Sequence, residues 1–220
     1  MKIGKRILCM VLAFALISSI CAMAASHPFK DVASGSWYEA DVQYVYEKEL
    51  MGGTAADLFA PNVNMNRAML VTVLYRLEGA PAVEKDAPFT DVKKNTYYFD
   101  AVAWAYENEI VNGISATLFA PGNNITREQM ITIFARYARF KGLETLSLND
   151  LTDYDDRAKV SSYALDAFRW GVGTGIINGT SATTLAPQGT ATRAQCAAIL
   201  HRFIEWTQTN DREDWETEEI

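Results

Sequence analysis

The stretch NITREQM at residues 124–130 decides the fold, because related stretches occur twice more, as NMNRAML at 64–70 and ATRAQCA at 191–197. Arg67 and Arg127 lie 60 residues apart, Arg127 and Arg193 lie 66 apart, and an Ala-Pro pair precedes each arginine by about six residues. A motif that recurs at such an interval is typical of a repeat architecture. The sequence therefore predicts three related units and three related surfaces rather than one active site.

Each unit is predicted to be a helix, a short turn or extended segment, and a second helix. In the middle copy, apolar residues between 101 and 106 recur at near-helical spacing, 118–120 is a short extended segment, and a second helix begins at Thr126. Gly113 is expected to end the first helix, since glycine adopts the left-handed conformation without steric cost. One unit buries little apolar surface, so three should pack together. The predicted fold class is mainly α, with repeats at 28–78, 88–141 and 153–206 and connectors at 79–87 and 142–152.

The N-terminal residues resemble a secretory signal peptide. Basic residues precede an apolar run from Ile7 to Ile20, and Ala22-Met23-Ala24 is a plausible cleavage signal, so residues 1–24 are assigned to the signal. An uncleaved anchor is disfavoured because a spanning helix needs ~20 apolar residues. Lipidation at Cys21 is disfavoured by the bulky Ile20 before it. The mature protein is therefore expected outside the cytoplasm without a membrane segment.

The C-terminal residues 207–220 differ from the repeats in composition. They carry six acidic residues and one arginine, and they lack an apolar stripe at helical spacing. They are expected to form a mobile acidic tail. An alternative is a docking peptide for an envelope protein partner, through Trp215.

Charge and composition exclude several classes of function. Removal of the signal leaves 17 basic and 27 acidic residues, a formal net charge of −10, which argues against nucleic-acid binding. Cys196 is then the single thiol and is expected to be a buried apolar residue. His27 and His201 have no nucleophile or ligand motif at recognisable spacing. No cofactor, metal or catalytic residue is expected.

The start of each second helix carries the most informative chemistry. Thr126 with Gln129 and Thr192 with Gln195 fit a capping box, whereas Asn66 is a cap without a reciprocal partner. An arginine in the first helical turn opposes the helix dipole. Free helix amides beside a guanidinium group would bind a carboxylate or phosphate, and an inter-repeat salt bridge is the alternative.

Several motifs recur in the same order and resemble the S-layer homology (SLH) repeat. In the middle copy they are Phe89-Thr90-Asp91-Val92, Ile110-Val111-Asn112-Gly113, Leu118-Phe119-Ala120-Pro121 and Ile125-Thr126-Arg127-Glu128-Gln129. The resemblance covers roughly residues 28–206. It implies a pseudo-threefold bundle whose grooves between repeats bind secondary cell-wall polysaccharide, often through a pyruvylated sugar. Such binding holds proteins non-covalently on the cell surface of Gram-positive envelopes.

The resemblance also implies a set of ligand-binding residues. For the glycines, close approach of a sugar and simple helix capping are the two alternatives. For the aromatic residues, the alternatives are stacking on a sugar and burial in the core. In repeat 3, Arg157 stands at the spacing of the early aspartate, with Asp153 and Asp155 nearby. The groove that relies on repeat 2 is expected to be the most complete. The implied residues are Arg67, Arg127, Arg193, Asn66, Thr126, Thr192, Gly53, Gly113, Gly179, Trp37, Tyr97, Tyr163, Asp31 and Asp91.

Two other classes of function remain open beside wall anchoring. A scaffold for envelope proteins is compatible with the repeats, and no substantial cargo domain is expected after Trp206. A wall-glycan hydrolase would need two carboxylates ~5–10 Å apart on opposing walls of a cleft. Asp155 and Asp156 are a candidate pair, but adjacent residues do not face each other across a bond by default.

Overall fold

A computed structural model describes residues 27–147 and 149–216, so the signal peptide expected at 1–24 and residues 217–220 of the expected tail lie outside the described residues. The described part is helical, and two short 3-10 helices open repeat 3. The helices are α2 (Glu39–Glu47), α3 (Arg67–Leu77), α4 (Phe99–Glu107), α5 (Arg127–Phe140), η1 (Arg157–Lys159), η2 (Ser162–Ala164), α6 (Leu165–Gly173) and α7 (Arg193–Glu216).

The mainly α fold class is confirmed. Within the described ranges no strand forms, and extended residues make only isolated bridges, such as Ala55 with Leu58 and Ser181 with Thr184. The segment expected to be extended at 118–120 has no regular secondary structure, and Ala120 takes the left-handed conformation at φ 59°.

The first helices end earlier than the glycine pattern predicted. α4 ends at Glu107, and Glu109 takes the left-handed conformation at φ 57°, as Glu49 does at φ 58° in repeat 1. Gly113 is not left-handed, so its expected role as a helix terminator is wrong. The helix stops because the chain turns at Glu109 and buries Ile110 and Val111 in the core.

The three second helices begin around a closed ring of backbone hydrogen bonds. Met65 N donates to Ala191 O at 2.8 Å, Ala191 N donates to Ile125 O at 3.0 Å, and Ile125 N donates to Met65 O at 2.9 Å. All three side chains are fully buried. Each repeat thus donates to one neighbour and accepts from the other, which gives the bundle its pseudo-threefold centre.

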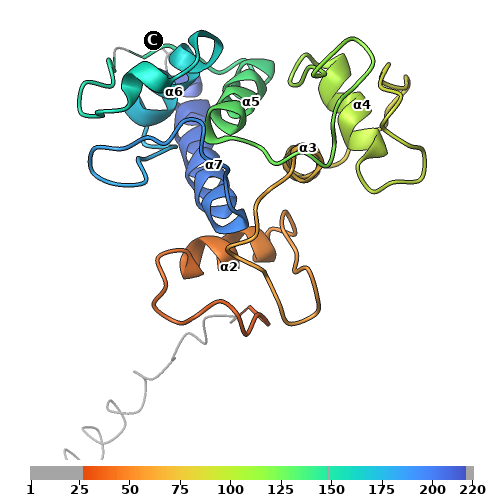
Figure 1. Ribbon diagram of the computed structural model, residues 1–220, viewed down its shortest axis with the longest axis horizontal. Coiled ribbons are helices and arrows are strands. Elements are labelled where there is room, and N and C mark those ends of the chain that lie inside the picture. The colour runs from red at the N-terminus through yellow and green to blue at the C-terminus, as the bar shows by residue number, and fades with distance from the viewer. Residues whose placement is uncertain (1–26, 148, 217–220) are drawn as a thin grey trace, which may run out of the picture.

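Helices pair between repeats rather than within them. The first helix of each repeat packs against the second helix of the preceding repeat, as α4 on α3 and α6 on α5, and α2 closes the circle on α7. Figure 1 shows the result as three peripheral lobes around the second helices. A single repeat therefore lacks the partner of each of its own helices.

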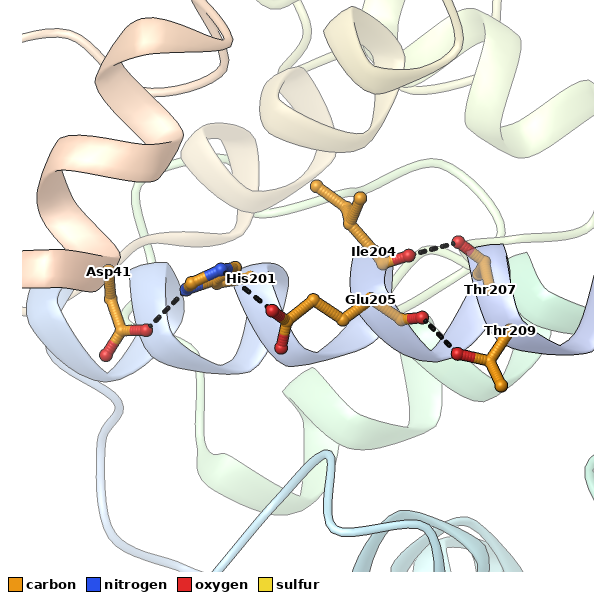
Figure 2. A network of polar contacts seen from close by, with 6 residues as sticks. All are labelled: Asp41, His201, Ile204, Glu205, Thr207 and Thr209. Atoms are coloured by element: carbon orange, nitrogen blue, oxygen red, sulfur yellow. Dashed lines mark hydrogen bonds and ion pairs between the residues drawn. The ribbon is translucent and has the colours of Figure 1, made fainter.

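The interface between α2 and α7 carries a polar cluster (Figure 2). His201 Nδ1 lies 2.8 Å from Asp41 Oδ1, and Nε2 lies 3.4 Å from Glu205 Oε1. The Tyr44 ring stacks on the imidazole at a centroid distance of 3.8 Å. His201, which had no assigned role, therefore helps to join repeat 1 to repeat 3.

The acidic C-terminal segment differs from the expected mobile tail, because α7 continues to Glu216. Trp206 anchors the continuation by packing on Trp170 at 5.3 Å, and Thr207 Oγ1 donates to Ile204 O at 2.8 Å (Figure 2). Extending a helix that is already nucleated adds one hydrogen bond per residue fixed, so an apolar stripe is not required.

Candidate functional site

The amides at the start of each second helix are occupied by the next repeat. In α5, Arg127 N donates to Gly189 O at 2.9 Å and Glu128 N donates to Pro187 O at 3.0 Å, and α3 and α7 make the equivalent bonds. The capping box of Thr126 and Gln129 is confirmed, and its two bonds use the amides of Gln129 and Thr126. The expectation of free helix amides for an anion is therefore wrong.

The caps of the other two second helices follow the sequence prediction. Asn66 Oδ1 accepts from Met69 N at 2.8 Å. Thr192 and Gln195 exchange two bonds, of 3.3 and 3.2 Å, so they too form a capping box. Thr126, Thr192 and Asn66 thus act as helix caps.

The three motif arginines are buried and bind backbone carbonyls of the following repeat. Arg67 donates from Nε to Phe119 O at 2.9 Å and from Nη2 to Asn112 O at 2.8 Å. Arg127 bonds in the same way to Leu185 O and Asn178 O, and Arg193 to Phe59 O and Gly52 O. These are inter-repeat hydrogen bonds to carbonyls, not the salt bridges considered from the sequence.

Burial leaves these guanidinium groups with little compensation from carboxylates. Desolvation lowers the pKa of Arg67, Arg127 and Arg193, and the nearby aspartates of the next repeat only partly oppose it. Arginine nevertheless stays protonated. Within the described residues none of the three makes an ion pair, and Nη1 of each donates no hydrogen bond. Each arginine therefore keeps a donor nitrogen for a ligand.

The early aspartates support the turn that holds these carbonyls. Asp31 accepts from Phe59 N at 2.8 Å and from Ala60 N at 2.7 Å, and Asp91 accepts from Phe119 N and Ala120 N. Ala60 and Ala120 both have φ 59°, a strained conformation for alanine. The carboxylates are therefore structural anchors of the turn.

Repeat 3 uses Asp156 for this purpose, so neither Arg157, Asp153 nor Asp155 is the equivalent. Asp156 accepts from Leu185 N and Ala186 N, both at 2.8 Å. One extra residue between Asp156 and Leu185 displaced the spacing that was read from the sequence. Asp156 thus holds the turn at Leu185 and Ala186 as Asp31 and Asp91 hold the equivalent turns.

The glycines Gly53, Gly113 and Gly179 each line a hollow. A Cβ atom on Gly113 would collide with Ser115 O and Leu118 O and with the Phe89 ring, and Gly53 and Gly179 meet equivalent atoms. Tight packing beneath the hollow thus requires glycine there.

The early aromatic residues lie at the surface rather than in the core. Trp37, Tyr97 and Tyr163 have exposed fractions of 63%, 62% and 54%. Each lines a hollow formed mainly by the preceding repeat.

Three equivalent grooves result, and each draws on all three repeats. Groove 1 is defined by Gly53, Met69, Arg76, Tyr97 and Arg193, with a volume of about 380 Å³. Groove 2 is defined by Gly113, Gln129, Arg136, Tyr163 and Arg67, with about 250 Å³. Groove 3 is defined by Gly179, Gln195, Arg202, Trp37 and Arg127, with about 450 Å³. Groove 2 is the groove formed mainly by repeat 2, and that it is the most complete of the three stays a prediction.

Sequence reasoning missed a second arginine in each groove. Arg76, Arg136 and Arg202 each stand nine residues after a motif arginine. Nine residues make about 2.5 helical turns, so the two arginines of one helix face opposite directions. α5 thus supplies Arg127 to groove 3 and Arg136 to groove 2. The fixed spacing was the signal available in the sequence.

A buried carboxylate fixes the aromatic wall of groove 2. Glu128 has an exposed fraction of 3% and accepts from Tyr163 Oη at 2.9 Å and from Ser161 Oγ at 3.0 Å. Partial burial and this hydrogen bond raise the pKa of Tyr163 to about 12. The corresponding positions in the other repeats are Ala68 and Ala194, so this support is specific to groove 2.

Three further features of the described residues concern the thiol, metal ligands and membrane-spanning helices. Cys196 is a free, buried thiol, as expected. Searching residues 27–147 and 149–216 gives no cluster of three or more potential metal ligands. Over the same residues, none of the helices has the length and apolar character needed to span a bilayer.

Comparison with known proteins identifies the family. The model of the S-layer homology domain matches residues 28–68, 88–131 and 153–197. The chain therefore belongs to the S-layer homology domain family. Domains of this family are binding modules that anchor S-layer and surface proteins to the cell wall through its polysaccharide.

The similar proteins are large surface proteins and enzymes. An endoglucanase of Bacillus sp. (strain KSM-635) is 32% identical, over 91% of this chain and 22% of the enzyme. The surface-layer 125 kDa protein of Lysinibacillus sphaericus is 31% identical, over 86% of this chain and 16% of that protein. A cell surface protein of Thermoanaerobacter kivui is 26% identical, over 93% of this chain and 25% of that protein.

The chain spans a quarter or less of the length of these relatives. The family and the surface-protein relatives indicate a location at the cell surface, in contact with the cell wall.

Proposed function

We propose that the chain anchors itself to the cell wall by binding an acidic sugar of the secondary cell-wall polysaccharide in grooves 1, 2 and 3. The sugar carboxylate, such as that of a pyruvate ketal, binds between the buried and the second guanidinium group of a groove. Trp37, Tyr97 and Tyr163 pack against the sugar ring. Binding leaves the glycan intact, so the chain acts as a binding module and not as an enzyme.

One observation carries this proposal. Each groove holds two guanidinium groups that make no ion pair within the described residues, on a chain with more acidic than basic residues. A buried cation without a carboxylate is costly, and a ligand carboxylate compensates it with charge-assisted hydrogen bonds. The groove volumes of about 250–450 Å³ approach or fall within the range of small-ligand sites.

Co-sedimentation with purified cell-wall sacculi tests the proposal. The protein should sediment with intact sacculi, and it should stay in solution after chemical removal of the wall polysaccharide. A pyruvate-ketal monosaccharide should compete for binding, and the same sugar without the ketal should not. Equal binding to stripped sacculi would refute the proposal and favour a protein-interaction scaffold. Shortening of a soluble wall fragment would instead indicate a hydrolase.

A protein partner for the acidic end of α7 remains a separate proposal. The segment after Trp206 continues as a helix to Glu216 and is rich in carboxylates, so a partner with a basic surface would complement it. A chain that ends at residue 206 should keep its wall binding and lose such a partner.

A further inference from the structure

A second hollow adjoins groove 2 on the far side of Arg136. Its volume is about 840 Å³, larger than that of any of the three grooves, and it lies within the range of ~300–1,000 Å³ for small-ligand sites. Tyr106, Glu107, Glu109 and Arg139 line it. Arg136 and Asn112 line both this hollow and groove 2, so the two are adjacent.

The same arrangement occurs again in repeat 1, across Arg76. There a hollow of about 490 Å³ is lined by Tyr46, Glu47, Glu49 and Arg76, and it shares Arg76, Met51 and Gly52 with groove 1. The tyrosine and the two glutamates stand 60 residues before their counterparts in repeat 2. Two repeats thus build equivalent hollows from equivalent residues.

Repeat 3 departs from this plan at the two glutamate positions. It carries Gly173 and Gly175 there. A Cβ atom on Gly173 would collide with Ser147 of the connector, so the connector occupies the space of the missing side chain. The second hollow is therefore a property of grooves 1 and 2.

Two charged side chains that line the larger hollow, Arg136 and Glu109, are available to a ligand. Arg136 takes part in no hydrogen bond or ion pair within the described residues, and burial, together with the nearby Arg139, lowers its pKa. Glu109 likewise makes no ion pair there, and Glu107 reaches only Lys85, at 4.0 Å. Donors and acceptors thus face one hollow without satisfying each other.

The mixture of groups favours a neutral sugar over a second acidic one. Sugar hydroxyl groups donate to carboxylates and accept from guanidinium groups, so both kinds of side chain find partners. The carboxylates of Glu107 and Glu109 would repel another anion. Tyr106 and Phe140, with exposed fractions of 40% and 39%, offer apolar ring surface at the rim.

We propose that the hollow beyond Arg136, and its counterpart beyond Arg76, is a second saccharide subsite that binds a neutral sugar next to the acidic sugar of the groove. This inference rests on the proposed function of the grooves. The shared arginine contacts both sugars, and one polysaccharide chain runs from the groove into the hollow.

Calorimetric titration of the mature chain with two ligands tests the second subsite. One ligand is the pyruvate-ketal monosaccharide, and the other is a wall-polysaccharide fragment of at least three sugars that contains it. The variant replaces Glu47, Glu49, Glu107 and Glu109 with glutamine. The control replaces four exposed acidic residues elsewhere, Glu84, Glu144, Asp153 and Asp155, with their amides, which changes the net charge equally.

The variant should bind the monosaccharide as tightly as the parent chain does, and it should bind the longer fragment about 10-fold more weakly. The control should bind the fragment at least as tightly as the parent, because loss of negative charge favours an anionic glycan. For the variant, the loss of negative charge alone thus predicts tighter binding of the fragment, whereas the loss of subsite contacts predicts weaker binding.

The subsite is refuted if the variant binds the fragment as tightly as the parent, or if the control weakens equally. It is also refuted if the parent binds the fragment no more tightly than the monosaccharide. Failure of the parent chain to bind the monosaccharide at all would refute the groove function itself, which is a different outcome.

Discussion

Groove 2 contains two arginines for which the same substitution should have different main effects. Arg67 is buried and bonded to two carbonyls, whereas Arg136 is half-buried and has no hydrogen bond within the described residues. We expect Arg67→Met to destabilise the fold and Arg136→Met to weaken ligand binding. Methionine keeps the apolar part of the arginine side chain in both variants, so each variant loses mainly the polar contacts of its arginine.

The expected loss in the free energy of unfolding for Arg67→Met follows from the two carbonyl oxygens that lose their donor. Phe119 O is buried, and an unsatisfied buried acceptor costs about 1–3 kcal/mol. Asn112 O is only partly buried and can turn to water, so it adds about 1 kcal/mol. The total of about 2–4 kcal/mol is a large part of a typical stability of about 5–15 kcal/mol.

Urea unfolding followed by circular dichroism measures this loss. With an m-value near 2 kcal/mol/M, the midpoint for Arg67→Met should fall by about 1–2 M. Arg136→Met should unfold within about 0.5 kcal/mol of the parent chain, because no structural bond is lost. The same variant should bind the acidic monosaccharide about 10-fold more weakly at groove 2, since it loses a charge-assisted contact.

An unchanged midpoint for Arg67→Met would show that the carbonyl bonds do not stabilise the fold, and the account of the buried arginines would fail. Equal destabilisation by both variants would refute the division of labour between them.

Three further substitutions or probes address single features. Asp156→Ala should lower the free energy of unfolding by about 2–4 kcal/mol, because two amides lose a charged acceptor, whereas Asp155→Ala should change it by less than about 0.5 kcal/mol in the same urea experiment. Cys196 should not react with a thiol reagent at pH 8 until urea unfolds the chain, because burial raises the pKa of its thiol to about 12. Glu128→Ala should move the pKa of Tyr163 from about 12 toward its ordinary value of 10.0, measured by ultraviolet titration with Tyr163→Phe as the reference for its signal.

The raised pKa of Tyr163 also predicts how the stability of the chain depends on pH. The folded chain holds the Tyr163 proton to a higher pH than the unfolded chain does. The contribution of Tyr163 to the free energy of unfolding is therefore fully present below about pH 10 and is lost as the pH rises toward 12. The parent chain should lose stability in this window, and Glu128→Ala should lose less. Equal losses of stability in the parent chain and in Glu128→Ala would contradict the role of Glu128. Equal stabilities of Asp155→Ala and Asp156→Ala would contradict the role of Asp156. Rapid labelling of the native chain would contradict the burial of Cys196.

Local signals in the sequence predicted the helices and caps well. Thr126 with Gln129 and Thr192 with Gln195 are capping boxes as expected, because capping depends on residues three apart in the chain. The location of Cys196 in the core also follows from a local apolar pattern.

Features that depend on a neighbouring repeat could not be read in this way. The partners of Arg67 are carbonyls 45 and 52 residues away, and no side-chain pattern marks a backbone acceptor. Asp156 was displaced by one inserted residue, which a fixed spacing does not detect. The second arginines, in contrast, stand at a fixed nine-residue interval from the first, but an exposed arginine late in a helix is also typical of a solvated helix face, so the interval alone does not mark a site.

The exchange of contacts around the centre has a consequence for synthesis of the chain. Arg193 bonds to Phe59 O and Gly52 O, 134 and 141 residues earlier, and α2 packs against α7. When the first two repeats have left the ribosome, α2 still lacks its partner helix and groove 1 still lacks its buried cation. Maturation of the first repeat thus waits for the last helix, and a chain released early would expose apolar surface to proteases and chaperones.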